Sequence, residues 1–185
     1  GRAGQRRDQF VSSAARREAD ELVTALTSPP TIDGSALFAG GRNTLITTAA
    51  LAAPKLAEAV TAMRMQADLD GGLVVQEPAY LIVPAALELT ARQLMATFNP
   101  ATTGAVQPYN TLNVVVEPRL DAISATSWYL AAANQSALEY GYLDGAEGPQ
   151  ITQQEGFEVD GVQIKARLDF GCGWVSPVGW VKATA

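Results

Sequence analysis

LVVQEPAYLIVPAALELTARQLMATF, residues 73–98, is the stretch that decides the fold. Its β-branched and aromatic run at residues 80–83 favours a buried strand. Pro84 suits the first turn of a helix, where its missing N–H needs no partner. The next apolar side chains recur at the spacing of one helix face, and they are Leu87, Ala91, Leu94, Met95 and Phe98. We predict a buried strand feeding a core helix, with Glu88 and Arg92 as a surface ion pair four residues apart.

Composition limits the size and the surface of the fold. The chain has 185 residues, of which 48% are hydrophobic and 17% are charged, with a net charge of −6 at pH 7. This length allows one substantial core, or two small cores that share strands. Because surface charge is scarce, we predict that much of the surface contacts other protein chains. A monomer rich in small residues is the alternative.

Charge is unevenly distributed along the chain. Residues 1–20 carry five Arg, whereas residues 120–164 carry no Lys or Arg. The acidic residues of that second stretch are Asp121, Glu139, Asp144, Glu147, Glu155, Glu158 and Asp160. We favour a solvated acidic face over a face that meets basic partners or a neighbouring copy. If the stretch faces its own copies, association strengthens as salt screens the repulsion.

Several classes of function are excluded by missing residues. The chain has no histidine, which removes Ser-His-Asp and Cys-His catalysis and histidine metal sites. Cys172 is the single cysteine, so no internal disulfide forms, and we expect it to be a small packed residue. No apolar run is long enough to span a membrane, no signal peptide is visible, and the whole chain lacks a basic footprint for phosphate binding.

Three local patterns were considered as chemical sites. The glycines at residues 40–43 lack the Lys-Ser or Lys-Thr of a nucleotide-binding loop. The Asp-x-Asp-Gly string at residues 68–72 lacks the later acidic ligands of a calcium loop, so we predict a glycine helix stop. An acid pair among Glu77, Glu88 and Glu117 has no supporting motif. We therefore predict no catalytic, cofactor-binding or metal-ligating residue, and no cofactor.

Two more helices are predicted from periodicity. Residues 8–26 form a long surface helix with one buried face, preceded by a flexible basic tail at residues 1–7 and stopped by Pro29. Another helix begins at Pro54 and ends before the glycines of the 68–72 stretch. Its inward residues are Leu56, Val60, Met63 and Ala67.

Strands are predicted on both sides of a polar loop and a turn-rich boundary. Residues 112–117 and 128–132 read as neighbouring strands of a small sheet packed by two helices. Residues 99–110 read as a mobile loop and residues 143–149 as a boundary rich in turns. Asp33-Gly34 reads as a turn.

The C-terminal part reads as hairpins. Asp160-Gly161 predicts a turn between strands at residues 157–159 and 162–170, and the alternation of the second strand buries one of its faces. Residues 171–173 are predicted to bend, with a last hairpin around Pro177. Helices followed by a β-rich tail define the fold class as α+β.

Short stretches also follow a characteristic order along nearly the whole chain. They are Arg17-Glu18, Asp33-Gly34, Leu37-Phe38, Asn43, residues 56–66, PAYLIVP at 78–84, LNVVVEPRLD at 112–121, WYL at 128–130, residues 142–145, residues 148–149, residues 160–161 and KARLDFG at 165–171. This order resembles the major capsid proteins of tailed bacteriophages, particularly the branch related to fusions of prohead protease and capsid protein.

The resemblance implies the Hong Kong 97-type capsid fold. It implies a peripheral domain with a spine helix at residues 1–50, an axial domain at 51–144 and return strands of the peripheral domain at 145–185. It also implies a structural subunit, not an enzyme, that assembles into pentamers and hexamers of an icosahedral shell around the phage DNA. Implied partners are further copies, a portal, scaffold or prohead protease, and the packaged DNA through non-specific contact, without a membrane. The implied location is the virion, assembled in the host cytoplasm.

The chain departs from the family pattern in two respects. The family often has a histidine before Asn43, where this chain has Arg42. The chain resembles the C-terminal two-thirds of such a protein, since an N-terminal arm and an extended loop normally precede the spine helix. We therefore expect a monomer or a small ring.

Two alternatives to a capsid subunit stay open. An encapsulin-like compartment is the main alternative, and a phage tail or adhesin module using the loop at residues 99–110 is the second.

Overall fold

A computed structural model describes residues 2–68, 70–96, 112–134, 137–155 and 162–185. The chain forms two compact units. Unit 1 contains residues 1–28 and 138–173, and unit 2 contains residues 29–137 and 174–185. Helices and mixed sheets in these units confirm the α+β class. Both units are discontinuous in sequence, and their bounds place residues 29–50 and 174–185 in unit 2.

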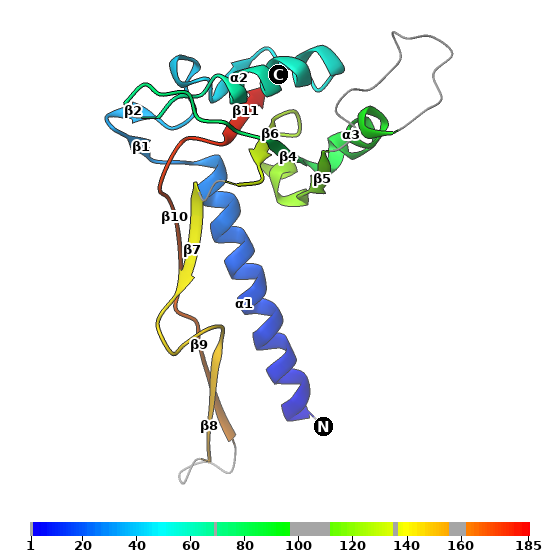
Figure 1. Cartoon of the computed structure of the whole chain (residues 1–185). Coiled ribbons are helices and arrows are strands. Elements are labelled where there is room, and N and C mark those ends of the chain that lie inside the picture. Colours follow the sequence, from blue (N-terminus) through cyan, green and yellow to red (C-terminus); the bar gives the residue numbers. More distant parts are fainter. Residues whose placement is uncertain (1, 69, 97–111, 135–136, 156–161) are drawn as a thin grey trace. The chain divides into compact units, whose positions relative to one another are not determined.

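A five-stranded mixed sheet organises unit 2 (Figure 1). Its strands lie in the order β3 (Leu45–Thr47), β11 (Trp180–Thr184), β6 (Trp128–Ala132), β4 (Pro78–Val83) and β5 (Asn113–Val116). β11 pairs parallel with β3 and antiparallel with β6, and β4 pairs antiparallel with β6 and parallel with β5. The predicted strands at residues 112–117 and 128–132 are thus correct, but they are not neighbours, because β4 lies between them.

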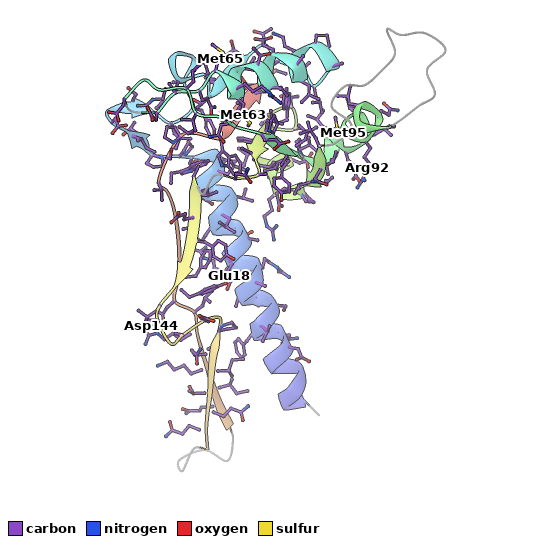
Figure 2. The ribbon with its side chains drawn as sticks, viewed as in Figure 1. Glu18, Met63, Met65, Arg92, Met95 and Asp144 are labelled. Carbon is purple, nitrogen blue, oxygen red and sulfur yellow. The ribbon has the colours of Figure 1, made fainter. Side chains whose placement is uncertain are left out.

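One face of this sheet forms the core of unit 2. The register aligns Leu81 of β4 with Leu130 of β6, and Leu130 with Val181 of β11, and all three are fully buried. Helix α2 (Ala53–Arg64) packs on them with its buried residues Leu56, Ala59, Val60 and Met63. Met63 is fully buried whereas Met65, beyond the helix end, is 53% exposed (Figure 2). Each buried side chain of this size contributes about 1.5–3 kcal/mol. The prediction that Ala67 faces inward is wrong, because the helix ends before it and its side chain is exposed.

Aromatic side chains cover part of the opposite sheet face. Tyr129 of β6 contacts Phe38 at 5.9 Å between ring centroids, and Phe38 contacts Trp174 at 5.7 Å. Trp174 in turn meets Trp180 of β11 edge-on at 5.3 Å. The Lys182 ammonium lies 5.8 Å from the ring centroids of both Phe38 and Tyr129. The sheet therefore has an aliphatic face under α2 and an aromatic face with one cation.

The predicted strand and helix of residues 73–98 are confirmed, with a different junction. After β4, Pro84 precedes a 3-10 turn, η2 (Ala85–Leu87), and α3 runs from Glu88 to Met95. Ala91 is buried, with Leu87, Leu94 and Met95 packed against the core. The Arg92 Nε lies 2.7 Å from Glu88 Oε1, as predicted. Before β4 the chain is not buried throughout, since Val75 is 96% exposed. Phe98 and the predicted loop at residues 99–110 lie outside the described residues.

A distant carboxylate fixes the start of this helical segment. Asp121 lies in the 3-10 helix η4 (Pro118–Ala122), and its two carboxylate oxygens accept hydrogen bonds from Ala85 N at 2.6 Å and Ala86 N at 3.0 Å. These donors are unpaired first-turn amides, which a side-chain acceptor satisfies. One member of the acidic stretch is therefore structural.

Asp121→Ala is expected to lower the free energy of unfolding by about 1–2 kcal/mol, the usual effect of removing a helix cap. Urea unfolding followed by circular dichroism measures this. Asp144→Ala, at an exposed turn position, is the matched control and should change stability by less than about 0.5 kcal/mol. Equal effects of the two substitutions would show that the cap is not stabilising.

Unit 1 combines a long helix with two-stranded ribbons. Helix α1 spans Arg2–Thr27, so the predicted flexible tail at residues 1–7 is wrong for residues 2–7, which are helical. Strand β7 (Leu138–Tyr142) pairs with β10 (Phe170–Trp174), and β8 (Gln150–Glu155) pairs antiparallel with β9 (Val162–Arg167). The amphipathic stripe of α1 is buried at Val23 and Leu26, but Phe10 and Val11 are exposed. The expected buried face therefore extends over only part of the helix.

Several predictions for the C-terminal part are wrong. The strand expected at residues 162–170 is two strands, because residues 168–169 leave the ladder. Its alternating face is only partly buried, with Ile164 intermediate and Ala166 exposed. Residues 171–173 belong to strand β10 rather than a bend. The hairpin expected around Pro177 is absent from the described sheets, since β10 pairs with β7 and β11 with β3 and β6.

The remaining turn predictions divide into confirmed and untested ones. Asp33 and Gly34, with φ of 53° and 73°, join the short strands β1 (Thr31–Ile32) and β2 (Ser35–Ala36) as predicted. The boundary at residues 143–149 joins β7 to β8. The strand at 157–159 and the Asp160-Gly161 turn lie outside the described residues, and the described partner of β9 is β8. No helix in the described part of the chain has both the length and the hydropathy of a membrane span.

Candidate functional site

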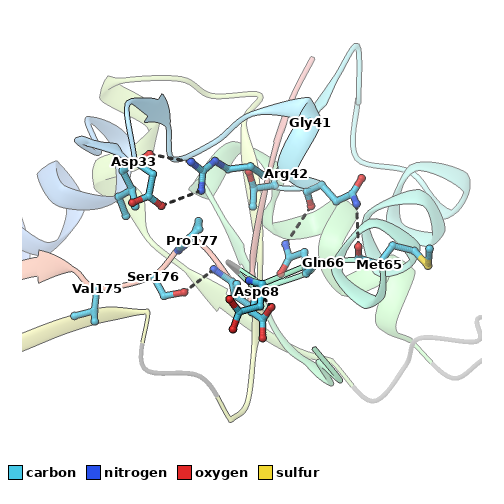
Figure 3. A pocket seen from close by; sticks show the side chains of 15 residues that line it. Asp33, Gly41, Arg42, Met65, Gln66, Asp68, Val175, Ser176 and Pro177 are labelled. Carbon is cyan, nitrogen blue, oxygen red and sulfur yellow. Dashed lines mark hydrogen bonds and ion pairs between the residues drawn. The ribbon is translucent and has the colours of Figure 1, made fainter. Parts of the chain in front are cut away.

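Unit 2 contains a pocket of about 620 Å³ (Figure 3). It lies between the Gly40–Asn43 loop, the end of α2 and the segment before β11. Its lining is Ile32, Asp33, Gly41, Arg42, Asn43, Thr44, Met65, Gln66, Ala67, Asp68, Asp70, Val175, Ser176, Pro177 and Val178. The lining is mixed, with amide and carboxylate groups beside apolar side chains.

Gln66 joins three chain segments beneath this pocket. Its Nε2 donates to the carbonyl oxygens of Asn43 at 3.1 Å and Trp180 at 2.8 Å, and its Oε1 accepts from Gly179 N at 2.7 Å. The side chain is 1% exposed. A buried amide with these partners satisfies backbone groups that have no other bond there. Gln66 therefore holds the end of α2 to the loop before β3 and to the start of β11.

The glycine loop considered as a phosphate cradle is closed by its own bonds. Arg42 N donates to the Ala39 carbonyl at 3.2 Å and Asn43 N to the Gly40 carbonyl at 3.1 Å. Asn43, at φ 57°, also donates its side-chain amide to the Met65 carbonyl at 3.0 Å. Arg42 Nη2 donates to the Ile32 carbonyl at 2.9 Å, and its Nη1 is 3.8 Å from the Asp33 carboxylate. These donors serve the fold, so the loop offers them to no phosphate.

The glycine stop predicted for α2 is wrong, because the helix already ends at Arg64, and the turn that Asp68 forms with residues 70–72 is separate from it. The Asp68 Oδ1 accepts from Asp70 N and from Gly72 N, both at 3.0 Å. Gly71 has φ 81°, a conformation that favours glycine. In the described residues no group of three or more acidic or thiol side chains is placed to hold a metal ion.

The three carboxylates of the possible acid pair, Glu77, Glu88 and Glu117, have different neighbours. Glu88 pairs with Arg92 on α3, and Glu117 Oε1 lies 2.9 Å from Arg119 Nη1 while accepting from Arg119 N at 3.0 Å. Glu77 is exposed directly before β4, and its carbonyl accepts from Ala133 N at 3.1 Å. No contact joins any two of these carboxylates among the described residues.

Burial shifts the protonation of a few groups. It raises the pKa of Tyr129 to about 12 and lowers the pKa of Lys182. Desolvation raises the pKa of the Cys172 thiol, and the nearby Glu21 carboxylate raises it further. A raised pKa keeps a thiol protonated and therefore weakly nucleophilic. Cys172 is half-buried on β10, in keeping with the small packed residue expected from the sequence.

The ionisation of Tyr129 predicts a loss of stability in alkali. An unfolded phenol ionises near pH 10, before the folded one, so the unfolded state binds fewer protons between about pH 10 and about pH 12. The contribution of the neutral buried phenol is complete below about pH 10 and falls by about 2–3 kcal/mol through that window. Urea unfolding near pH 9 and near pH 11.5 should show a smaller loss for Tyr129→Phe than for the wild type. Parallel losses in the two proteins would contradict this assignment.

Large apolar side chains are exposed in both units. In unit 2 they are Met65, Leu73, Val75, Tyr80, Leu89, Val115, Ile123 and Val175, and in unit 1 they are Phe10, Val11, Tyr140 and Leu143. Tyr80 and Val115 lie on the sheet face opposite the α2 core, since Ile82 is aligned with Val115 and Tyr80 is two residues before Ile82. These side chains are available for contact with other protein chains where they lie next to one another on the surface.

The comparisons with known proteins agree with this picture of a structural subunit. The family described as phage capsid protein matches residues 3–183 of the chain. The comparison with curated proteins gives no match. Because the family match covers nearly the whole chain, the protein belongs to the phage capsid protein family. Its members are structural proteins of the virion, and membership implies self-assembly into a shell.

The sequence indicates the class of protein but not the structural roles of Gln66 at the pocket and Asp121 at the start of the α3 segment. Gln66 and Asp121 end two of the stretches in the family order, residues 56–66 and 112–121, but each bonds to backbone groups far away in the chain, which those stretches do not indicate.

Proposed function

We propose that this capsid protein forms pentamers and hexamers of an icosahedral shell that encloses the phage DNA. The family match over residues 3–183 carries the proposal. Exposed apolar side chains in both units support it, because self-association would cover them. In this proposal unit 1, with helix α1, is the peripheral domain, and unit 2, with the five-stranded sheet, is the axial domain.

The proposal extends to partners and place of assembly. Assembly takes place in the host cytoplasm, with a portal, scaffold or prohead protease as further contacts. The packaged DNA touches the shell without sequence preference. The low density of basic charge supports a weak, non-specific contact over a dedicated nucleic-acid site.

Sedimentation velocity and negative-stain images of the purified chain test this function. From the sequence we expect a monomer or a small ring rather than a closed shell. The proposed function requires the ring, of about five or six copies, because closed symmetry needs repeated contacts around an axis. A protein that stays monomeric at every concentration would contradict the proposal. Particles from infected or expressing cells that protect DNA from nuclease would support a genome shell, and particles filled with an enzyme would favour an encapsulin-like compartment.

A further inference from the structure

The strands of unit 1 place different side chains on their two faces. Ring contacts join Tyr140 to Tyr142 at 6.2 Å and both rings to Phe170, at 6.1 and 5.5 Å, so these three share a face. Side chains alternate between the two faces along a strand. Across the break between β9 and β10, Arg167 and Asp169 form an ion pair at 2.7 Å, so these two side chains lie on the same side. The other side, called the outer face here, carries Glu139, Gly141, Thr152, Gln154, Gln163, Lys165, Arg167, Asp169, Gly171 and Gly173.

Helix α1 lies on the aromatic side of the ribbon. Burial raises the pKa of the Tyr142 phenol, and the Glu18 carboxylate of α1 raises it further. Burial also raises the pKa of the Cys172 thiol, to which the Glu21 carboxylate of α1 adds. Figure 2 shows Glu18 on the side of α1 that faces β7. Apart from the half-buried Asp169, the described outer-face residues are exposed. Unit 1 therefore leaves its outer face uncovered.

The outer face is nearly bare along β7 and β10. A Cβ added at Gly141, Gly171 or Gly173 would meet nothing within 4 Å, and none of the three has a positive φ. Neither backbone conformation nor crowding within the unit requires glycine there, although glycine weakens a strand interior. Glycine in such a position is typical of a place where another chain approaches closely.

The charges on this face are complementary and separated. Lys165 on β9 and Glu139 on β7 are exposed, and neither forms an ion pair with any described residue. Arg167 is already neutralised by Asp169. A face on which Lys165 at the hairpin and Glu139 on the ribbon have no ion-pair partner among the described residues is self-complementary when a second copy is turned by a two-fold rotation.

We propose that the outer face of unit 1 packs against the same face of a second copy, so that Lys165 of each copy meets Glu139 of the other. This contact rests on the proposed function, because it is one of the interfaces that self-assembly requires. It weakens as salt rises, which is the opposite of the effect expected if the acidic stretch met its own copies.

A charge swap tests the contact. Lys165→Glu and Glu139→Lys should each weaken association of the full chain about tenfold or more, since symmetry turns two attractions into two repulsions. The double variant should recover to within about threefold of the wild type. Asp144→Lys, with the same change of charge at an exposed turn, is the control and should associate as the wild type does. Sedimentation velocity gives the dissociation constants, and circular dichroism checks that the variants are folded.

A glycine substitution provides a second test, in which monomer stability and association are expected to change in opposite directions. Gly171→Val adds a side chain that has free space in the unit and favours a strand, so the Tm of the monomer should stay the same or rise. The same side chain blocks close approach, so association should fall. Single reversals without effect, a double variant that does not recover, or normal association of Gly171→Val would overturn the contact while leaving self-assembly intact. A wild type that never associates would overturn the proposed function as well.

Discussion

Gln66→Met is expected to lower the free energy of unfolding by about 3–5 kcal/mol, although the two side chains have similar volume. The substitution leaves the Gly179 amide without its acceptor at 2.7 Å, and it removes the donor from the carbonyls of Asn43 and Trp180. Each buried group left without a partner costs about 1–3 kcal/mol. Urea unfolding at neutral pH measures the loss.

Gln93→Met is the matched control for this substitution. Gln93 is exposed on α3, so its replacement should stay within about 0.5 kcal/mol of the wild type. Hydrogen exchange adds a local readout, because the Gly179 amide should exchange faster in the Gln66 variant. Equal stabilities of the two variants, or unchanged exchange at Gly179, would show that the bonds of Gln66 do not hold the three segments together.

Leu81→Ala is expected to lower the free energy of unfolding by about 2–5 kcal/mol, the range for a cavity in a rigid core. Leu81 is 0% exposed on β4, where it is aligned with Leu130 and with Val114. Strands on both sides and α2 above leave the site little room to collapse. Thermal unfolding followed by circular dichroism also reports the change, as a fall in Tm.

Leu89→Ala and Leu94→Ala calibrate this effect on the neighbouring helix. Leu89 is 69% exposed, so its loss should stay within about 0.5 kcal/mol. The sequence alone predicts the same large loss at Leu94 as at Leu81, but Leu94 is only partly buried against the core, and about 1–2 kcal/mol is expected. A ranking other than Leu81, Leu94, Leu89 would mean that the core is placed wrongly. Thr102, predicted to tolerate Ala, lies outside the described residues.

The sequence by itself determined the elements whose cause is local. The β-branched run at residues 80–83 and the helical spacing from Leu87 to Met95 need only periodicity and burial, and both are confirmed. The order of short stretches along the chain also led to the capsid family, which the family match shows. The domain bounds at residues 50 and 144, which the resemblance implies, stay predictions.

The tertiary structure decided what depends on partners distant in sequence. β11 lies between β3 and β6, over a hundred residues from β3, and local pattern carries no record of such a pairing. Gln66 and Asp121 read as ordinary polar residues until folding brings backbone groups to them. The alternation at residues 162–170 correctly predicted which side chains share a face, but it wrongly predicted that this face is buried. Periodicity shows which side chains lie on the same face of a strand, and it cannot show whether this chain or another one covers them.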